Sequence, residues 1–189
     1  MPGTESHAVS RTRSRATPRL IVLVGLPGAG KSTVGALAAA RCSWSFIDLD
    51  VEIERAAGST VAEIFARDGE AGFRLLEREA TQRLARAERV VIAAGGGWML
   101  DPGNRAVLGA GAITVYLRVS PEVAIARMRA EVATRPLLAG TDPLGALERL
   151  FTARDTLYVQ ANHILAAETM SADEVADTIV ALATSPEAD

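Results

Sequence analysis

The chain has 189 residues and a formal net charge of −3, and 49% of its residues are hydrophobic, so its length suits one domain with a sizeable core. The absence of any apolar run of about 18 residues excludes a membrane-spanning helix, and the acidic balance argues against a nucleic-acid-binding body. The single cysteine, Cys42, excludes an internal disulfide framework and a Cys-rich metal site.

Residues 1–19 form a segment that differs in composition from the rest. Four arginines against one glutamate give it a net charge of +3, which leaves −6 on the remaining chain. The segment is rich in Ser, Thr and Pro and has no apolar periodicity, so we expect a disordered basic tail. An organelle-targeting peptide is the alternative, since such peptides are rich in Arg and Ser and poor in acidic residues.

From residue 20 onward, the pattern alternates between short β-branched runs and Ala- and Leu-rich amphipathic segments. Strands are predicted over residues 20–24, 44–49, 89–93, 113–119 and 163–166. Helices are predicted over 31–41, 70–86, 121–130 and 144–159, with two more opened by capping boxes at Thr60–Glu63 and Ser171–Glu174. A Gly- and Pro-containing loop is expected over 134–143. Such alternation predicts an α/β fold with a parallel sheet covered on both faces.

The first predicted strand runs directly into a phosphate-binding motif. Residues 25–32, GLPGAGKS, match G-x-x-x-x-G-K-[ST] at every fixed position, between a strand and a helix as the motif requires. Glycines let the backbone approach phosphate oxygens, and the helix N-terminus favours the anion. Lys31 would reach the β- and γ-phosphates, and Ser32 would place its hydroxyl on Mg²⁺. The motif therefore predicts binding of ATP or GTP.

The use of basic residues supports this interpretation of the motif. Of 20 basic residues, 19 are arginine and one is lysine, and that lysine is Lys31. The chain thus uses arginine for general positive charge and a compact ammonium at one place, where a planar guanidinium is not an equivalent.

Asp48 and Asp50 close the second predicted strand, in the stretch FIDLD. Residues two apart in a strand share a face, so both carboxylates are predicted to project beyond its carboxyl end, where open α/β sheets bind ligands. One could hold a Mg²⁺-bound water and the other could accept a proton from a substrate hydroxyl. The alternative is a helix N-cap aspartate with a solvated neighbour.

Four further features, taken alone, are either part of a ligand site or ordinary structural and surface residues. Residues 95–97 are three glycines after the third predicted strand, which either admit a ligand against the backbone or make a tight turn. Arg74 and Arg154 lie in helical segments, where arginines are usually solvated. Arg135 lies in the loop segment TRPLLAG, where an arginine can close over a transferring phosphate.

These features, taken in order, resemble the shikimate kinase family. GLPGAGKST, FIDLD, IFARDGEAGFRLLE, GGG, RPLLAG and RDTLY occur in the family's order over residues 20–183. The resemblance implies a three-layer fold like that of nucleoside monophosphate kinases, with a five-stranded parallel sheet of strand order 2-3-1-4-5. It also implies one kinase domain over 20–189, with a substrate-binding region over about 50–87 and a lid over about 129–141.

The resemblance assigns the nucleotide side of the site as follows. The ATP phosphates would be cradled by Gly28, Ala29, Gly30, Lys31, Ser32 and Thr33. Ser32 would ligate Mg²⁺ and Asp48 would hold it through water. Arg135 would be the lid arginine facing the transferring phosphate. Arg127 matches a position whose guanidinium lies over adenine, with Arg129 as the rival because the lid is one residue longer than usual.

The resemblance also assigns the acceptor side. Asp50 would contact the shikimate hydroxyls and act as the base. Arg74 and Arg154 would clamp the shikimate carboxylate, a role that suits arginine's bidentate geometry. Gly96 would offer its backbone to the substrate. Catalysis would rest on Lys31, Asp50 and Arg135, through positioning and neutralisation of charge.

The implied reaction is phosphate transfer from ATP to the 3-hydroxyl of shikimate, in aromatic amino-acid biosynthesis. We expect a cytoplasmic monomer that acts on a small molecule and contacts neither nucleic acid nor membrane. Two alternatives remain: a kinase for another hydroxylated acceptor, such as gluconate or a nucleoside monophosphate, and a catalytically silent ATP-binding regulator.

Three residues depart from the family pattern. Thr156 stands where proline is usual and could loosen a turn that presents Arg154. Trp98 follows the glycines where a small residue is common, and either packs under the sheet or narrows the substrate pocket. Ala94 removes a hydroxyl that often lies near Mg²⁺.

Overall fold

The computed structural model of the chain describes residues 18–128, 132, 135–138 and 140–184. A five-stranded parallel sheet forms its centre, with the strand order β2-β3-β1-β4-β5 that the family resemblance implies. The strands are β1 (Leu20–Val24), β2 (Ser45–Asp48), β3 (Val90–Ala93), β4 (Ala112–Leu117) and β5 (His163–Leu165). The central strand β1 is wholly buried, as expected of a parallel strand that is covered on both faces.

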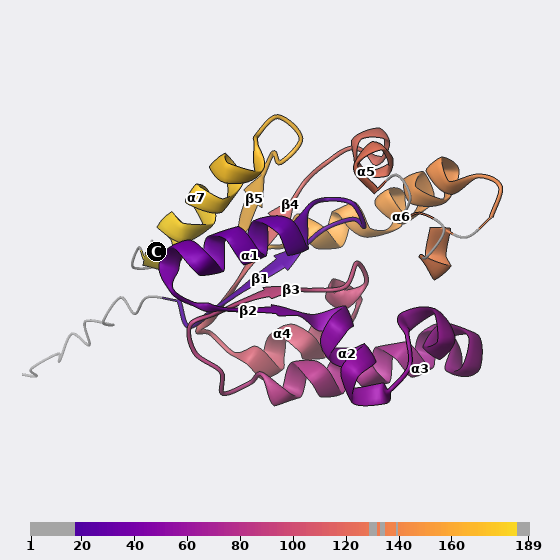
Figure 1. Cartoon of the computed structure of the whole chain (residues 1–189), viewed down its shortest axis with the longest axis horizontal. Helices are drawn as coiled ribbons and strands as arrows, with labels where there is room; N and C mark the ends of the chain where they lie inside the picture. The colour runs from indigo at the N-terminus through magenta and orange to yellow at the C-terminus, as the bar shows by residue number, and fades with distance from the viewer. Residues whose placement is uncertain (1–17, 129–131, 133–134, 139, 185–189) are drawn as a thin grey trace, which may run out of the picture.

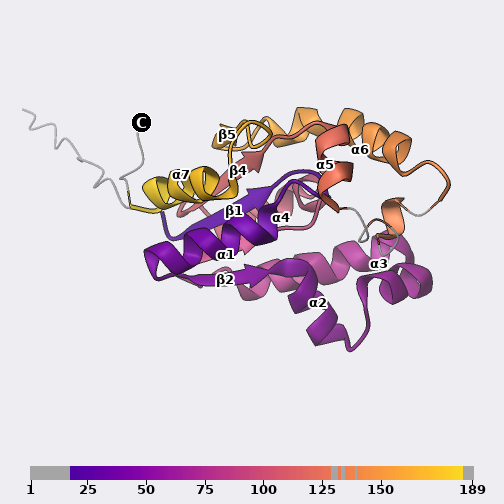
Figure 2. The ribbon, with the colours of Figure 1, turned by 45° about the horizontal axis from the view of Figure 1, so that its top comes forward.

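Helices cover both faces of this sheet, as predicted. Figure 1 shows α1 and α7 on one side of the strands and α3 and α4 on the other, and Figure 2 shows α6 passing above α3. The helices are α1 (Lys31–Cys42), α2 (Leu49–Ala57), α3 (Val61–Arg83), α4 (Pro102–Leu108), α5 (Pro121–Met128), α6 (Pro143–Tyr158) and α7 (Ala172–Thr184), with 3₁₀ turns η1 (Trp98–Leu100) and η3 (Pro136–Leu138). Within the described residues, no helix is long and apolar enough to cross a membrane.

Every predicted strand and helix is present within a few residues of its expected position. Both predicted capping boxes form: Thr60 and Glu63 exchange side-chain to backbone hydrogen bonds, and so do Ser171 and Glu174. Helices α2 and α4 were not predicted. The first follows β2 without a connecting loop, and the second starts at Asp101, a cap followed by proline at the first helical position. The predicted loop over 134–143 contains η3.

Gly69 interrupts α3, so the segment consists of two helices, as the sequence predicted. Its backbone has φ +69° and ψ −175°, a conformation that is open almost only to glycine. The chain changes direction there, and the second helix begins with Glu70. This break determines how the charged residues of the second helix approach the sheet.

Arg19, the last residue of the predicted tail, contacts the folded domain. Of the predicted tail over residues 1–19, residues 1–17 lie outside the described part of the chain. Arg19, however, is built into the body: its guanidinium donates to the carbonyls of Ala85, Ala87 and Leu108. Its N–H bonds the carbonyl of Gly111, and its own carbonyl accepts the N–H of Arg89. Arg19 therefore belongs to the folded domain.

Candidate active site

The loop between β1 and α1 has the backbone that a phosphate cradle needs. Gly28 has φ +79°, and a Cβ there would collide with the carbonyl oxygen of Ala124. Gly30 has φ +93° and caps α1 without a side-chain hydrogen bond. The first N–H groups of α1 therefore remain available to an anion at the positive end of the helix.

Lys31 places its ammonium at the start of this loop. Its Nζ donates to the carbonyl oxygens of Gly25, at 3.0 Å, and Leu26, at 2.9 Å. Burial lowers the pKa of Lys31 to about 8, although the nearby carboxylate of Asp50 partly offsets this effect. An anionic ligand beside Lys31 would raise this pKa again and so favour the protonated, positively charged ammonium. The attraction between that ammonium and the ligand would contribute to binding.

Asp48 caps a helix with one carboxylate oxygen and contacts Ser32 with the other. One oxygen, Oδ1, accepts the N–H of Asp50 at 3.1 Å and so caps α2. The other, Oδ2, accepts a 2.5 Å hydrogen bond from the Ser32 hydroxyl. A hydroxyl and a carboxylate side by side at a phosphate loop suit Mg²⁺, which prefers oxygen ligands and takes few of them from protein. The described residues contain no group of three or more His, Cys, Asp or Glu that could hold a metal.

Asp50 lies in the first turn of α2, so the predicted placement of both aspartates along one strand is wrong. β2 ends at Asp48, which caps the helix that follows. Asp50 is not the solvated neighbour of the alternative interpretation either: its Oδ1 is buried and has no hydrogen-bond partner in the described structure. Burial, with a smaller contribution from Asp48, raises the pKa of this carboxyl. Such a group is suited to accept a proton.

A cleft of about 1430 Å³ joins these groups. It runs from the phosphate loop past both aspartates to the glycines after β3. Among the predicted site residues it is lined by Gly28, Ala29, Gly30, Lys31, Ser32, Thr33, Asp48, Asp50, Gly96, Arg127 and Arg135. The residues assigned to the nucleotide and the proposed base therefore share one cavity. Arg74 and Arg154 do not line it and lie against Gly97 and Gly96.

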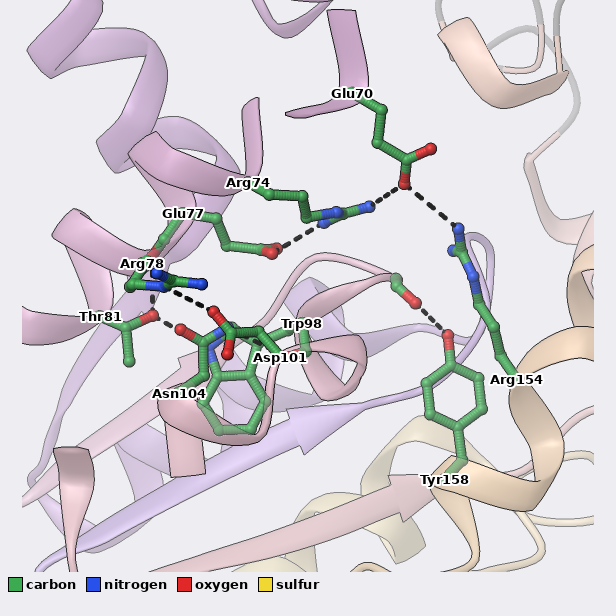
Figure 3. Close-up of polar contacts among 11 residues, drawn as sticks. Glu70, Arg74, Glu77, Arg78, Thr81, Trp98, Asp101, Asn104, Arg154 and Tyr158 are labelled. Carbon is green, nitrogen blue, oxygen red and sulfur yellow. Dashed lines mark hydrogen bonds and ion pairs between the residues drawn. The ribbon is translucent and has the colours of Figure 1, made fainter. Parts of the chain in front are cut away.

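Arg74 and Arg154 come from different helices and converge on one carboxylate (Figure 3). Oε1 of Glu70 lies 2.9 Å from Nη2 of Arg74, on α3, and 3.9 Å from Nη2 of Arg154, on α6. The Arg154 side chain is only 6% exposed, so it is not the surface arginine that its sequence context alone would favour. The two guanidinium groups are thus spaced to share a single carboxylate.

Glu77 is a site residue that the sequence analysis missed. Its side chain is fully buried; Oε2 accepts a 2.7 Å hydrogen bond from Nη1 of Arg74, and Oε1 has no partner. Burial raises the pKa of this carboxyl, and Arg74 works against that effect. The i, i+3 spacing from Arg74 on a helix could have pointed to this pair.

Three glycines after β3 bring these side chains together, because each lacks a Cβ where another group lies. A Cβ at Gly95 would stand 2.8 Å from Oε1 of Glu77 and 2.9 Å from Oδ1 of Asp50. At Gly96 it would stand 3.4 Å from Nη1 of Arg154, and at Gly97 it would collide with the Arg74 guanidinium. The segment is also a turn, since the N–H of Trp98 bonds the carbonyl of Gly95.

The buried polar atoms without partners indicate where a ligand would bind. Five side-chain atoms of this kind occur among the described residues, and four belong to Asp50, Arg74, Glu77 and Arg154. A buried polar group without a partner costs free energy, so their convergence on one glycine turn indicates a polar, oxygen-rich ligand there.

The structure gives each of the three departures from the family pattern a definite setting. Trp98 packs in the core at 1% exposure, and its Nε1 donates to the Thr81 hydroxyl at 3.0 Å. Thr156 lies inside α6, so a continuous helix presents Arg154 and the expected turn is absent. Ala94 is buried and lines the cleft.

The predicted lid, residues 129–141, is described at residues 132, 135–138 and 140–141, and Arg129 lies outside the described part. Arg135 lines the cleft and lies near enough to Lys31 to help lower its pKa. Arg127 also lines the cleft, and its Nη2 donates to the carbonyl of Ala167 at 2.9 Å.

Comparison with known proteins identifies a consistent set of relatives. The family model described as shikimate kinase matches residues 27–184. The curated shikimate kinase of Synechococcus sp. (strain RCC307) is 42% identical over 160 residues, covering 85% of this chain and 82% of that protein. The shikimate kinase of Symbiobacterium thermophilum is 46% identical over 145 residues, covering 76% and 83%.

Solved structures agree with these sequence relatives. Shikimate kinase from Acinetobacter baumannii in complex with shikimate has a TM-score of 0.82 and 36% identity, covering 88% of this chain and 93% of that one. A gluconokinase from Sinorhizobium meliloti, with a TM-score of 0.58 and 21% identity over 88% and 92% of the two chains, shares the fold.

Proposed function

This chain belongs to the shikimate kinase family and is an ATP-dependent phosphotransferase that acts on shikimate, and from that premise we propose how its residues perform the reaction. The γ-phosphate of ATP passes to the 3-hydroxyl of shikimate, with Lys31, Asp50 and Arg135 at the reacting groups. The proposal is supported by the cleft that joins the phosphate loop to the buried carboxyl of Asp50.

On the acceptor side, Asp50 accepts the proton of the attacking hydroxyl. The 3-oxygen of shikimate forms a bond to the γ-phosphorus as the bond between that phosphorus and the bridging oxygen of ADP breaks. The buried position of Asp50 raises its pKa and brings it closer to the working pH, where a general base is most effective. Lys31 and Arg135 neutralise charge on the transferring phosphoryl group, which is the main contribution a protein makes to this chemistry.

Ser32 and Asp48 would hold Mg²⁺, the first through its hydroxyl and the second through a bound water. The 2.5 Å contact between their oxygens shows that both point to one place beside the phosphate loop. An ion held by these two residues would offset the negative charge of the phosphates. The backbone N–H groups of the loop, from Gly28 to Thr33, position the phosphates.

The observation that carries the acceptor assignment is the pair of arginines behind the glycine turn. Arg74 and Arg154 already share a carboxylate, that of Glu70, and a substrate carboxylate would take its place. Gly96 offers its backbone between them and Asp50.

We further propose that the enzyme works as a cytoplasmic monomer. Light scattering should then give one mass near 19.8 kDa.

The decisive experiment measures ADP release from Mg-ATP with and without shikimate, with gluconate and nucleoside monophosphates as comparison acceptors. Only shikimate should stimulate release strongly.

In the same assay, Arg74→Ala should raise the KM for shikimate at least about tenfold, as expected for loss of a charged hydrogen bond to a carboxylate. The variant should leave the KM for ATP within about twofold. Stimulation by gluconate alone, or a selective loss of ATP affinity in the variant, would overturn the assignment.

A further inference from the structure

The carbonyls of the glycine turn have two kinds of partner. Those of Gly95 and Gly97 accept backbone N–H groups, from Trp98 and Leu100. The carbonyl of Gly96 instead accepts the phenol of Tyr158, at the C-terminal end of α6 (Figure 3). The orientation of the peptide between Gly96 and Gly97 is therefore tied to a side chain from another element.

Tyr158 is itself held firmly. It is 1% exposed, and its ring packs against Tyr116 of β4, with centroids 5.0 Å apart. Burial raises the pKa of its phenol, so it remains a hydrogen-bond donor at neutral and mildly alkaline pH. It lies one helical turn beyond Arg154, so the same end of α6 supplies both the clamp arginine and the phenol.

A glycine pair leaves the peptide between its members unusually free to rotate, because neither residue has a Cβ that restricts φ and ψ. In a planar trans peptide the C=O and the following N–H point in opposite directions. Fixing the carbonyl of Gly96 on Tyr158 therefore also fixes the direction of the Gly97 N–H. Arg154 lies against Gly96 and Arg74 against Gly97, so a rotated peptide would disturb both arginines.

We propose that Tyr158 is a positioning residue for the acceptor: its hydroxyl fixes the Gly96–Gly97 peptide in the orientation that fits shikimate between the two arginines. This inference rests on the proposed function, because it assumes that the glycine turn faces the acceptor. Tyr158 acts on the acceptor side through the backbone of Gly96, which accepts its hydroxyl, and its phenol also interacts with the Arg154 side chain.

Two conservative variants separate this role from a general effect of packing. Tyr158→Phe removes only the hydroxyl that holds Gly96. Tyr116→Phe removes the hydroxyl of the other ring of the same buried pair, which donates to Oδ1 of Asp155 at 2.8 Å and not to the glycine turn. Both variants keep the aromatic contact, and both delete one buried hydrogen bond.

Loss of one such hydrogen bond corresponds to about a 3- to 10-fold effect. Tyr158→Phe should raise the KM for shikimate by that factor and leave the KM for Mg-ATP within about twofold, whereas Tyr116→Phe should change neither. An independent readout is the ¹H–¹⁵N spectrum of the ligand-free protein, in which the amide signals of Gly96 and Gly97 should shift in Tyr158→Phe and not in Tyr116→Phe.

Failure of the positioning role of Tyr158 can be distinguished from failure of the proposed function. If the unmodified protein shows no shikimate-dependent ADP release, the proposed function is wrong. If it does, and Tyr158→Phe has unchanged glycine amide signals and an unchanged KM for shikimate, the positioning role is wrong. Equal effects on both variants, or on both substrates, would also overturn it, because they would indicate a loss of packing. Should Tyr158→Phe fold too weakly to assay, the amide spectrum at low temperature still decides.

Discussion

At the scale of single residues, burial shifts the pKa values of two ionisable groups of the site, Lys31 and Asp50. Lys31 loses hydration beside the phosphate loop, and its pKa falls to about 8. Asp50 loses hydration on the acceptor side, and its pKa rises. Both shifts favour the neutral form of the group. A polyanion beside the lysine would favour its charged form, and a hydroxyl beside the aspartate would give the buried Oδ1 the hydrogen-bond partner that it lacks.

The lysine makes nucleotide affinity dependent on pH. Below pH 8 Lys31 is protonated and ATP meets an ammonium; above it, binding must first take up a proton. The Kd for Mg-ATP should therefore rise about tenfold from pH 7 to pH 9, measured by calorimetry. Lys31→Arg keeps its charge throughout this range, so its weaker binding should vary little with pH. Parallel pH profiles for the two proteins would show that another group is responsible.

Residue roles were predictable where they depend on local sequence. The phosphate loop is contiguous, and the one lysine falls where the motif requires it, so Lys31 and Ser32 could be placed from sequence. The i, i+3 spacing could pair Glu77 with Arg74, but its place beside the glycine turn could not be predicted, since that depends on how α3 lies over the turn. The partners of Arg154 could not be predicted either, because Glu70 and Gly96 reach it from distant parts of the chain.

At the scale of elements, the break in α3 positions Glu70 and Arg74, which lie on the proposed acceptor side. Gly69 turns the chain so that the second helix starts with Glu70 and carries Arg74 one turn later toward the glycines. The sequence predicted two helices here, because the capping box and the charged run each mark one. It could not predict the angle between them, which depends on a backbone conformation available to glycine.

A matched pair of substitutions tests this role. Gly69 and Gly109 share nearly the same backbone conformation, with φ +69° and +73° and ψ near 180°, and a Cβ at either would meet nothing within 4 Å. Gly69→Ala and Gly109→Ala should each lower the free energy of unfolding by about 1–3 kcal/mol through backbone strain, measured by urea denaturation. Only Gly69→Ala should raise the KM for shikimate, at least about threefold, since small displacements of binding groups are costly.

That prediction fails if Gly69→Ala loses stability while its KM for shikimate stays unchanged, because the break would then serve folding alone.

Helix α2 shows a different limit of sequence reasoning. Its cap, Asp48, also accepts the Ser32 hydroxyl, so the residue at which the strand ends contacts the phosphate-loop helix as well. A pattern of alternating residues cannot show that one aspartate does both.

At the scale of the whole molecule, the active site lowers the stability of the fold that presents it. Asp50 and Glu77 are buried carboxyls with raised pKa values, and each has an oxygen without a partner. An acid whose pKa is higher in the folded than in the unfolded protein stabilises the fold at low pH, and this contribution is lost as pH rises through the folded-state value. At neutral pH such groups are maintained for function at the expense of stability.

Asp50→Asn should therefore have opposite effects on activity and stability. Turnover should fall at least about 100-fold through loss of the base, with Mg-ATP binding retained. The melting temperature at pH 8 should rise by about 2–4 °C, in line with a gain of about 1 kcal/mol for a chain of this length, and the gain should shrink as pH falls toward 4. Calorimetric melts at several pH values check this, and near-normal turnover would remove Asp50 from the catalytic role.

The overall architecture was the most predictable level. Alternating strands and helices indicated a parallel sheet covered on both faces, and the family resemblance supplied the strand order that β1 to β5 adopt. What sequence could not supply is how α6 returns over the glycine turn with Arg154 and Tyr158. That placement depends on packing between β4 and α6, including the contact between the rings of Tyr116 and Tyr158.

The scarcity of lysine has a practical consequence for chemical labelling. Lys31 is the chain's only side-chain amine, and with a pKa of about 8 roughly a tenth of it is unprotonated and nucleophilic at pH 7, and about half at pH 8. An amine-directed acylating reagent shaped like a nucleotide would thus modify one side chain, in the phosphate loop. Protection of that amine by ATP would turn mass spectrometry of the intact protein into a direct count of occupied nucleotide sites.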